Sequence, residues 1–333
     1  MFKFKNFFKP RAFPPDKAGG MMSRDFTAFR KTLTVEETIR QIRSLGKQGP
    51  LYYVYVTDDK NRLEGVLSMR DLVLADPHAS IESIVLKDVV SVPARADREE
   101  VLKLASQHSY LTIPVVDQGR HLLGIIHSKS LVRAAEEEAS EDIQKMFGAG
   151  GDEEATSSVF FSIRKRLPWL YVNLLTAFLA AFVVGLFENT IARITILAVF
   201  LPVVAGQGGN AGAQTLAVVI RGLAMGEIEK HLAKRVIWKE TCLGILNGVS
   251  VGVVTGVIGY LWEGNPFFGL VIGLAMIVNM AVACVSGAGI PMAMRAFGWD
   301  PAQSSSIILT TITDVIGFFS FLGLATLFQH LLI

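Results

Sequence analysis

The chain is poor in the residues from which disulfide-stapled folds and many metal-dependent enzymes are built. It has two cysteines and six histidines among 333 residues. Both Cys242 and Cys284 lie in apolar runs, which predicts reduced packing residues and no disulfide framework. The sequence also lacks a nucleophile–base pair, a Walker-type phosphate loop and a His/Cys metal cluster. These absences argue against an enzyme.

Acidic residues nearly vanish from the second half of the chain. Up to about Arg166 the sequence is charged and mixed, whereas long apolar runs follow it. This predicts a soluble domain joined to a membrane domain. The N-terminus has no continuous apolar core, so it is no signal peptide. Residues 1–30 are expected to form a tail, either disordered or touching an anionic membrane surface. The formal net charge of +2 says little about partners, and no nucleic-acid partner is expected.

Five segments are long and apolar enough to span a bilayer as helices. They are expected at about 167–187, 191–220, 236–262, 267–294 and 301–332. Basic residues gather in the loops on one side, which include the cluster 164–166 and the stretch 221–239, and only Arg193 lies on the other side. The positive-inside rule therefore predicts a cytoplasmic soluble half and a C-terminus outside the cell.

Polar and small residues inside the spans have helical spacings. Gln207, Asn210 and Gln214 fall on one face of the second segment. They predict either a helix–helix contact joined by amide hydrogen bonds or the lining of a hydrated cation pathway. In the third segment, glycines recur at every fourth position, which predicts tight packing and no chemistry. They are Gly244, Gly248, Gly252 and Gly256.

Asp314 is a lone carboxylate in the apolar C-terminal segment, with no basic residue within reach along its helix. A charged side chain near the bilayer midplane costs about 3 kcal/mol or more unless a cation or water meets it. Thr310, one turn before, and Gly317, one turn after, keep the same helix face small and polar. Hydroxyls at 306, 313 and 320 extend a stripe that we expect to face water. The simplest partner for this acid is a cation passing through.

An internal repeat organises the soluble half. YVYVTDD at 53–59 matches TIPVVDQ at 112–118, and LEGVLSMRDL at 63–72 matches LLGIIHSKSL at 122–131. A helix-like stretch precedes each pair. The pattern resembles a pair of CBS (cystathionine β-synthase-like) domains. The resemblance implies one pseudo-symmetric module, of a kind that often binds adenine nucleotides and usually dimerises.

Ser68 and Asp71 match the Ser/Thr-x-x-Asp pattern that holds a ribose in nucleotide-binding CBS domains. The second repeat has His127 and Ser130 at these positions, so at most one ATP site is expected. A structural role for Asp71 as a helix N-cap is the alternative.

A crowded acidic segment joins the repeat to the first membrane span. Like charges this close destabilise a helix unless cations relieve them. The segment is therefore either a solvated connector helix or an element that a divalent cation bridges to another part of the protein. Its acids are Glu136, Glu137, Glu138, Glu141 and Asp142.

Taken together, these features resemble the MgtE family of magnesium channels. The matching segments are the CBS pair, EEEASEDI, RKRLPWLYVNLLTAF, GGNAGAQ and DPAQSS…TTITDV. The resemblance implies an α+β cytosolic CBS-domain pair followed by an all-α polytopic membrane domain of five transmembrane helices per subunit. We expect a tail at 1–30, CBS domains at about 31–86 and 87–131, a connector and linker at 132–163, and a pore domain at 164–333. The expected location is the bilayer of the plasma (inner) membrane.

The family resemblance also implies a function. A homodimer would move hydrated Mg²⁺ into the cytoplasm through a central pore lined by Asp314, Thr310 and Gly317 of both subunits. Mg²⁺ dehydrates reluctantly and keeps several waters, which suits a pore with one carboxylate per subunit. The amides of Gln207, Asn210 and Gln214 would line the same path.

The acidic connector resembles the family's plug helix, which helps to close the pore when cytosolic Mg²⁺ is bound. Glu137, Glu138, Glu141 and Asp142 would be its regulatory metal ligands, and ATP is a second candidate regulator. About thirty residues precede the first CBS helix, too few for the helical N-terminal domain common in the family. Sensing sites shared with that domain are expected to be absent.

Two alternatives stay open. In the first, the protein is a cation-coupled secondary divalent-metal transporter or exporter, with Asp314 as a protonatable carrier. In the second, it is a membrane-anchored nucleotide sensor without transport.

Overall fold

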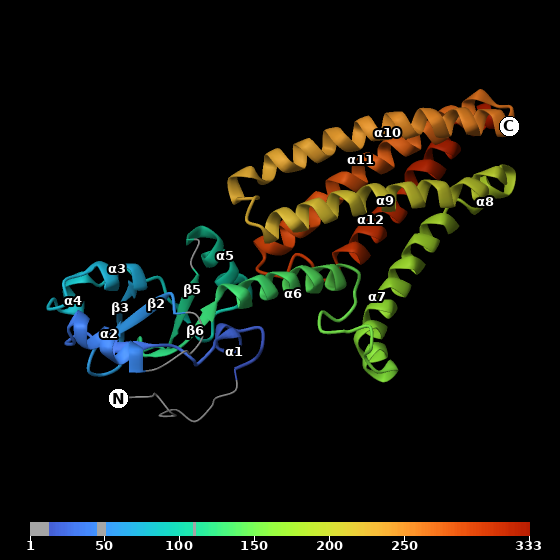
Figure 1. Ribbon diagram of the computed structural model, residues 1–333. Coiled ribbons are helices and arrows are strands. Elements are labelled where there is room, and N and C mark those ends of the chain that lie inside the picture. Colours follow the sequence, from blue (N-terminus) through green and yellow to red (C-terminus); the bar gives the residue numbers. More distant parts are fainter. Residues whose placement is uncertain (1–12, 45–50, 109–110) are drawn as a thin grey trace. The chain divides into compact units, whose positions relative to one another are not determined.

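The computed structural model describes residues 13–44, 51–108 and 111–333. The chain forms two compact units, the first ending at Glu138 and the second beginning at Ala139 (Figure 1). The long helix α6 (Ser128–Met146) crosses from one unit into the other along the chain.

The first unit contains the two predicted repeats, each with a three-stranded sheet. The sheet orders are β1-β2-β3 and β4-β5-β6. In each sheet the first pair of strands is parallel and the second antiparallel, as expected for paired CBS domains. The first repeat comprises β1 (Ala28–Arg30), α2 (Val35–Ser44), β2 (Tyr53–Thr57), β3 (Leu63–Ser68), α3 (Met69–Leu74) and α4 (Ile81–Ile84). The second comprises β4 (Val92–Pro93), α5 (Arg98–His108), β5 (Thr112–Val116), β6 (Leu122–His127) and the start of α6.

Apolar strand residues build a core in each repeat, and a buried polar contact joins the two. Val54, Val56 and Leu67 are fully buried in the first core. The Tyr55 hydroxyl lies 2.7 Å from Thr112 Oγ1 and links β2 to β5. A buried phenol without such a partner would be costly, so the contact fixes the register between the repeats.

Residues 13–30 differ from the expected tail. The short helix α1 (Ala18–Met21) places Ala18, fully buried, in the core of the second repeat with Val101 and Ile113. Lys17 Nζ pairs with Asp97 Oδ2 at 2.8 Å. The physical reason is the apolar content of this stretch, which is buried rather than solvated. Residues 1–12 lie outside the described part of the chain.

The second unit is helical, as predicted. Its described residues include five helices long and apolar enough to cross a membrane. They are α7 (Val159–Gly185), α9 (Ile196–Ala224), α10 (Ala233–Glu263), α11 (Pro266–Ala296) and α12 (Ser305–Leu327). The short helices α8 (Glu188–Arg193) and α13 (Gln329–Leu332) and the 3₁₀ turn η1 (Lys230–Leu232) complete the unit.

Local capping explains where α7 begins and where α6 ends. α7 begins at Val159, upstream of the expected residue 167, because the Ser158 side chain caps it by accepting from the Phe161 amide. α6 ends where Gly148 takes a left-handed conformation with φ of 75°. The Gly148 and Ala149 amides then donate to the carbonyls of Lys145 and Gln144, a C-terminal cap that favours glycine.

The glycine ridge predicted in the third span packs as expected. A Cβ built on Gly252 would lie 2.7 Å from the carbonyl oxygen of Gly273, and one on Gly256 would lie 2.7 Å from that of Gly269. Backbones of α10 and α11 are therefore in contact, and any larger residue would force them apart. The prediction of tight packing is confirmed.

The main apolar core of the second unit lies between α9, α11 and α12. Leu197, Ile272 and Phe321, one from each helix, are fully buried in it. α7 contributes little, since its only buried residues in the structure are Ala180 and Val183. Figure 1 shows α7 diverging from the other four spans toward its N-terminal end. Much of its apolar surface is left uncovered in one protomer.

Candidate functional site

Asp314 lies in the middle of α12 and is half-buried. Helix geometry places Thr310 and Gly317 on the same face, one turn to either side. Among the described residues, Asp314 forms no hydrogen bond and no ion pair. Its charge is therefore uncompensated within one protomer, in a segment that is otherwise apolar.

The polar stripe on α12 does not face one direction. Thr313 is fully buried and donates to the Thr310 carbonyl at 3.1 Å. Ser306 is also buried and donates to the Met146 carbonyl at 2.6 Å. Thr310 donates to the carbonyl of Ile307. Hydroxyls in an apolar helix commonly satisfy themselves in this way, so the expectation that the whole stripe meets water is wrong for Ser306 and Thr313.

The three amides of α9 share an exposed face. Gln207, Asn210 and Gln214 are all exposed, whereas Gly208 and Gly212 on the other side of the helix are buried. None of the three amides makes an interhelical hydrogen bond within the described part of the chain. The helix–helix contact that was one alternative is therefore not made inside a protomer, and no bond joins these amides to Asp314.

Asn279 of α11 was not predicted as a site residue, and it is fully buried between α9 and α12. Its Nδ2 donates to the Val204 carbonyl at 2.8 Å. A Cβ on Gly208 or on Gly317 would clash with its amide group. Gly317, which we expected in the pore lining, is thus buried against Asn279. A lone amide in an apolar span was the signal for this residue.

Glu240 of α10 is a second acid in the membrane unit that sequence reasoning missed, and it is buried. Thr215 Oγ1 donates to its Oε2 at 3.0 Å, and Lys239 Nζ donates to its Oε1 at 2.8 Å. The lysine beside it in the sequence supplies the compensating charge. Glu240 therefore ties α9 to α10.

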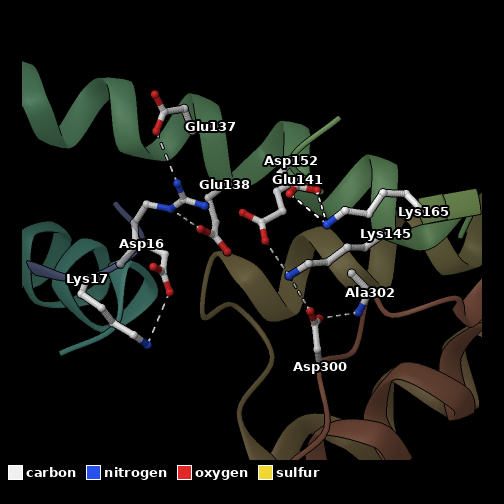
Figure 2. A network of polar contacts seen from close by, with 11 residues as sticks. Asp16, Lys17, Glu137, Glu138, Glu141, Lys145, Asp152, Lys165, Asp300 and Ala302 are labelled. Atoms are coloured by element: carbon white, nitrogen blue, oxygen red, sulfur yellow. Dashed lines mark hydrogen bonds and ion pairs between the residues drawn. The ribbon is translucent and has the colours of Figure 1, made fainter. Parts of the chain in front are cut away.

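Three acids of α6, Glu137, Glu138 and Glu141, have protein cations as partners (Figure 2). In the first unit, Arg98 Nε lies 2.5 Å from Glu138 Oε2, and its Nη1 lies 3.3 Å from Glu137 Oε2. The side chains of Arg98 and Glu138 are 10% and 15% exposed, so this pair is largely shielded from water. Such pairs hold elements in register, and breaking one leaves a charge uncompensated.

In the second unit, Lys145 lies between two carboxylates. Its Nζ is 2.8 Å from Glu141 Oε1 and 2.9 Å from Asp300 Oδ2, which belongs to the α11–α12 loop (Figure 2). Burial lowers the pKa of Lys145, but the hydrogen bonds to Glu141 and Asp300 outweigh it, so the pKa is raised. The ammonium stays charged and joins the end of α6 to the loop before α12.

The predicted regulatory ligands Glu137, Glu138, Glu141 and Asp142 do not gather into a metal cluster. In the described ranges, no group of three or more His, Cys, Asp or Glu side chains is placed to hold a metal ion. Arg98 and Lys145 occupy positions where a divalent cation could otherwise bridge these carboxylates.

A strap of ion pairs follows α6. Both guanidinium nitrogens Nε and Nη2 of Arg166 contact the buried Glu153 carboxylate, at 3.0 and 2.5 Å, and Gln144 Nε2 donates to the Glu153 carbonyl. Lys165 Nζ lies 2.9 Å from Asp152. The hydrogen bond from Arg166 lowers the pKa of Glu153, and that from Lys165 lowers the pKa of Asp152. The turn between α6 and α7 is thereby fixed.

The predicted nucleotide residues lie at the junction of β3 and α3. Ser68 caps α3, its Oγ accepting from the Asp71 amide at 3.0 Å and donating to Asp71 Oδ2 at 2.6 Å. The helix N-cap is therefore Ser68 rather than Asp71, so that alternative was wrong. The Asp71 side chain is exposed and that of Ser68 is partly exposed.

Two CBS repeats joined along the chain to five apolar spans, with an uncompensated acid in the last, are the features of a polytopic membrane transporter with a CBS-domain pair. The sequence profile of the MgtE family, described as "Divalent cation transporter", matches residues 201–324. The CBS-domain profile matches residues 18–78 and 81–137.

Relatives named as magnesium transporters resemble most of the chain. The magnesium transporter MgtE of Bacillus subtilis is 32% identical over 96% of this chain and 71% of its own length. That of Thermus thermophilus is 34% identical over 94% and 70%. A solved cytosolic domain of the Mg²⁺ channel MgtE in complex with ATP is 38% identical, covers 36% of this chain and 49% of its own, and has a TM-score of 0.35.

This chain belongs to the MgtE family of magnesium transporters. Family membership confirms the expected transport class, the CBS pair and the transported ion, and it agrees with the exclusion of an enzyme.

Proposed function

We propose that two copies of this chain form a Mg²⁺-selective channel in the plasma (inner) membrane, through which hydrated Mg²⁺ enters the cytoplasm. One observation carries the proposal. Asp314 has no cationic partner among the described residues, whereas Glu240 in the same unit has one. An acid left uncompensated in a membrane span needs a cation or water.

The ligand chemistry around Asp314 favours a hydrated, hard cation. Neither a cysteine nor a histidine flanks it along α12, which disfavours soft metals. Thr310 and the exposed amides of α9 offer oxygens that hydrogen-bond to metal-bound water rather than replace it. A passage of this kind suits Mg²⁺, which retains its waters, better than Ca²⁺, which takes more direct oxygen ligands.

A second copy would explain the surfaces that one protomer leaves uncovered. Gln207, Asn210 and Gln214 would face lipid in an isolated chain, and amides facing lipid without partners are costly. Across a twofold axis, the α9 faces and the two copies of Asp314 would border one aqueous path. Two facing carboxylates repel when empty, which favours occupancy by a divalent ion.

Gating would act through the connector predicted at 132–163, in which α6 would serve as a plug that closes the pore. The C-terminal end of α6 contacts the loop before α12 through Lys145, and it contacts the start of α12 through the Met146 carbonyl, which accepts from Ser306. Cytosolic Mg²⁺ would act on Glu137, Glu138, Glu141 and Asp142 to shift this end, and ATP would bind at Ser68 and Asp71. By the positive-inside rule, the CBS half would be cytoplasmic and the C-terminus outside.

Planar bilayer recordings test the proposal. The purified protein should carry Mg²⁺ current with no second ion gradient, and Asp314→Ala should abolish it. Glu188→Gln removes an exposed carboxylate at the start of α8 and should leave the current intact. A strict requirement for a proton or Na⁺ gradient would favour the coupled transporter or exporter instead. Normal current from Asp314→Ala would remove the basis for the proposal.

The ATP site has its own test. Calorimetric titration of the full-length protein with ATP should show binding that Ser68→Ala and Asp71→Ala weaken. Ser130→Ala, at the matching position of the second repeat, is the control. Equal binding by all four proteins would place ATP elsewhere or nowhere.

A further inference from the structure

The amide of Asn279 is fully buried in the membrane unit but only half satisfied. Its Nδ2 donates to the Val204 carbonyl of α9 at 2.8 Å. Its Oδ1 accepts no hydrogen bond from any residue that the structure describes. A buried acceptor without a donor destabilises a protein, and most such groups in folded proteins are satisfied. A leucine has nearly the same shape and would carry no such penalty.

Glycines make room for this amide from both sides. Gly208 of α9 and Gly317 of α12 both face it, and a Cβ on either would meet the amide atoms of Asn279. For Gly317 these distances would be 2.8 to 2.9 Å, closer than Cβ contacts allow. Asn279 therefore fits a notch that two separate helices form, and α11 is joined to both through it.

The notch lies beside the residues of the proposed ion path. Gly317 is one turn beyond Asp314 on α12, and Gly208 follows Gln207 on α9. The hydrogen bond to Val204 fixes α9 on the side opposite its exposed amides. A change in the size or polarity of Asn279 would shift α9 relative to α12 at the level of Asp314.

We propose that Asn279 is a positioning residue for ion selection: its amide sets the spacing and rotation of α9 against α12, and thereby the width of the path at Asp314. It does not contact the ion. The proposal rests on the proposed channel function. It explains why a half-satisfied amide stands where an apolar side chain would pack.

The test compares folding with selectivity in the full-length protein. Asn279→Leu keeps the branched shape at Cγ, replaces the amide atoms with slightly larger methyl groups and removes the hydrogen bond to Val204. Gly317→Ala keeps the amide of Asn279 but adds a methyl group that presses against it. The control is Gly323→Ala on the same helix, whose Cβ would meet only Phe187 in the described structure, at 4.0 Å. Thermal unfolding and gel filtration in detergent report folding, and reversal potentials with Mg²⁺ against K⁺ report the permeability ratio.

Asn279→Leu is expected to fold at least as well as the wild type, while its Mg²⁺-to-K⁺ permeability ratio falls about tenfold. Gly317→Ala should lower the ratio too, and Gly323→Ala should not. A folded Asn279→Leu protein with the wild-type ratio would overturn the proposal. So would failure of Asn279→Leu to fold, because the amide would then serve the fold itself.

Asp314→Ala is measured in parallel to separate the two proposals. If it conducts like the wild type, the channel assignment fails. If Asp314→Ala carries no current and Asn279→Leu has the wild-type permeability ratio, only the proposed role of Asn279 is contradicted.

Discussion

The acids of α6 and the acid of α12 differ in what neutralises them. Glu138 and Glu141 lie against Arg98 and Lys145, whereas Asp314 has no partner in the described part of its protomer. Glu240 shows that a compensated acid is also accommodated inside the membrane unit. Where the chain supplies its own cation, the carboxylate joins two elements. Where it supplies none, as at Asp314, the carboxylate is the group that we propose to meet the transported ion.

The largest expected effect is on Mg²⁺ current, when Asp314 is neutralised and Glu240 is not. Asp314→Asn should abolish Mg²⁺ current, because no other carboxylate on α12 can replace it. Glu240→Gln should conduct, since the glutamine Oε1 can still accept from Lys239 while its Nε2 donates to the Thr215 hydroxyl. Single-channel recording of both proteins checks this. Equal loss in both would mean that membrane acids matter for folding rather than for conduction.

The second-largest effect is expected when the shielded ion pair between Arg98 and Glu138 in the first unit is broken. Arg98→Met leaves Glu138 uncompensated, which costs about 3 kcal/mol. Amide hydrogen exchange in α5 and the first part of α6 should then speed up roughly a hundredfold. Arg133→Met is the control, because its pair with Glu137 is exposed and worth under about 1 kcal/mol. Unchanged exchange in Arg98→Met would contradict a structural role for this pair.

A smaller effect is expected when the link between α6 and the loop before α12 is cut. Lys145→Met keeps the apolar stem but leaves Glu141 and Asp300 facing each other without the ammonium. If the end of α6 closes the pore, closure should then need a higher Mg²⁺ concentration, by several-fold. Open probability against Mg²⁺ measures this, with Lys165→Met as the control at an exposed pair. The same dependence of open probability on Mg²⁺ in Lys145→Met and the wild type would show that this link takes no part in gating.

The smallest effect is a dependence on pH in the strap after α6. Glu153 and Asp152 have pKa values below the ordinary ones, which are about 4.3 and 3.9. A lowered folded pKa means stability that is present above the ordinary value and is lost as pH falls through the folded one. Exchange in the strap should therefore rise below about pH 4. Arg166→Met and Lys165→Met together should flatten this dependence; a persistent one would point to other carboxylates.

Features that depend on the order of residues along the chain could be predicted from the sequence. The internal repeat predicted the paired CBS domains, and the glycine spacing in α10 predicted tight packing. Sequence reasoning could not find pairs formed by residues far apart, such as Lys145 with Asp300 or Arg98 with Glu138, because ion pairing depends on the fold. The packing of Asn279 against Gly208 and Gly317 could not be predicted for the same reason, because it depends on three helices that the fold brings together.

The seam between α10 and α11 has a mechanical consequence. Main chains that touch along several turns leave no side-chain layer to shear, so these two helices can tilt only as a single body. In the proposed channel, α10 and α11 would therefore move together as one rigid pair whenever the pore opens or closes.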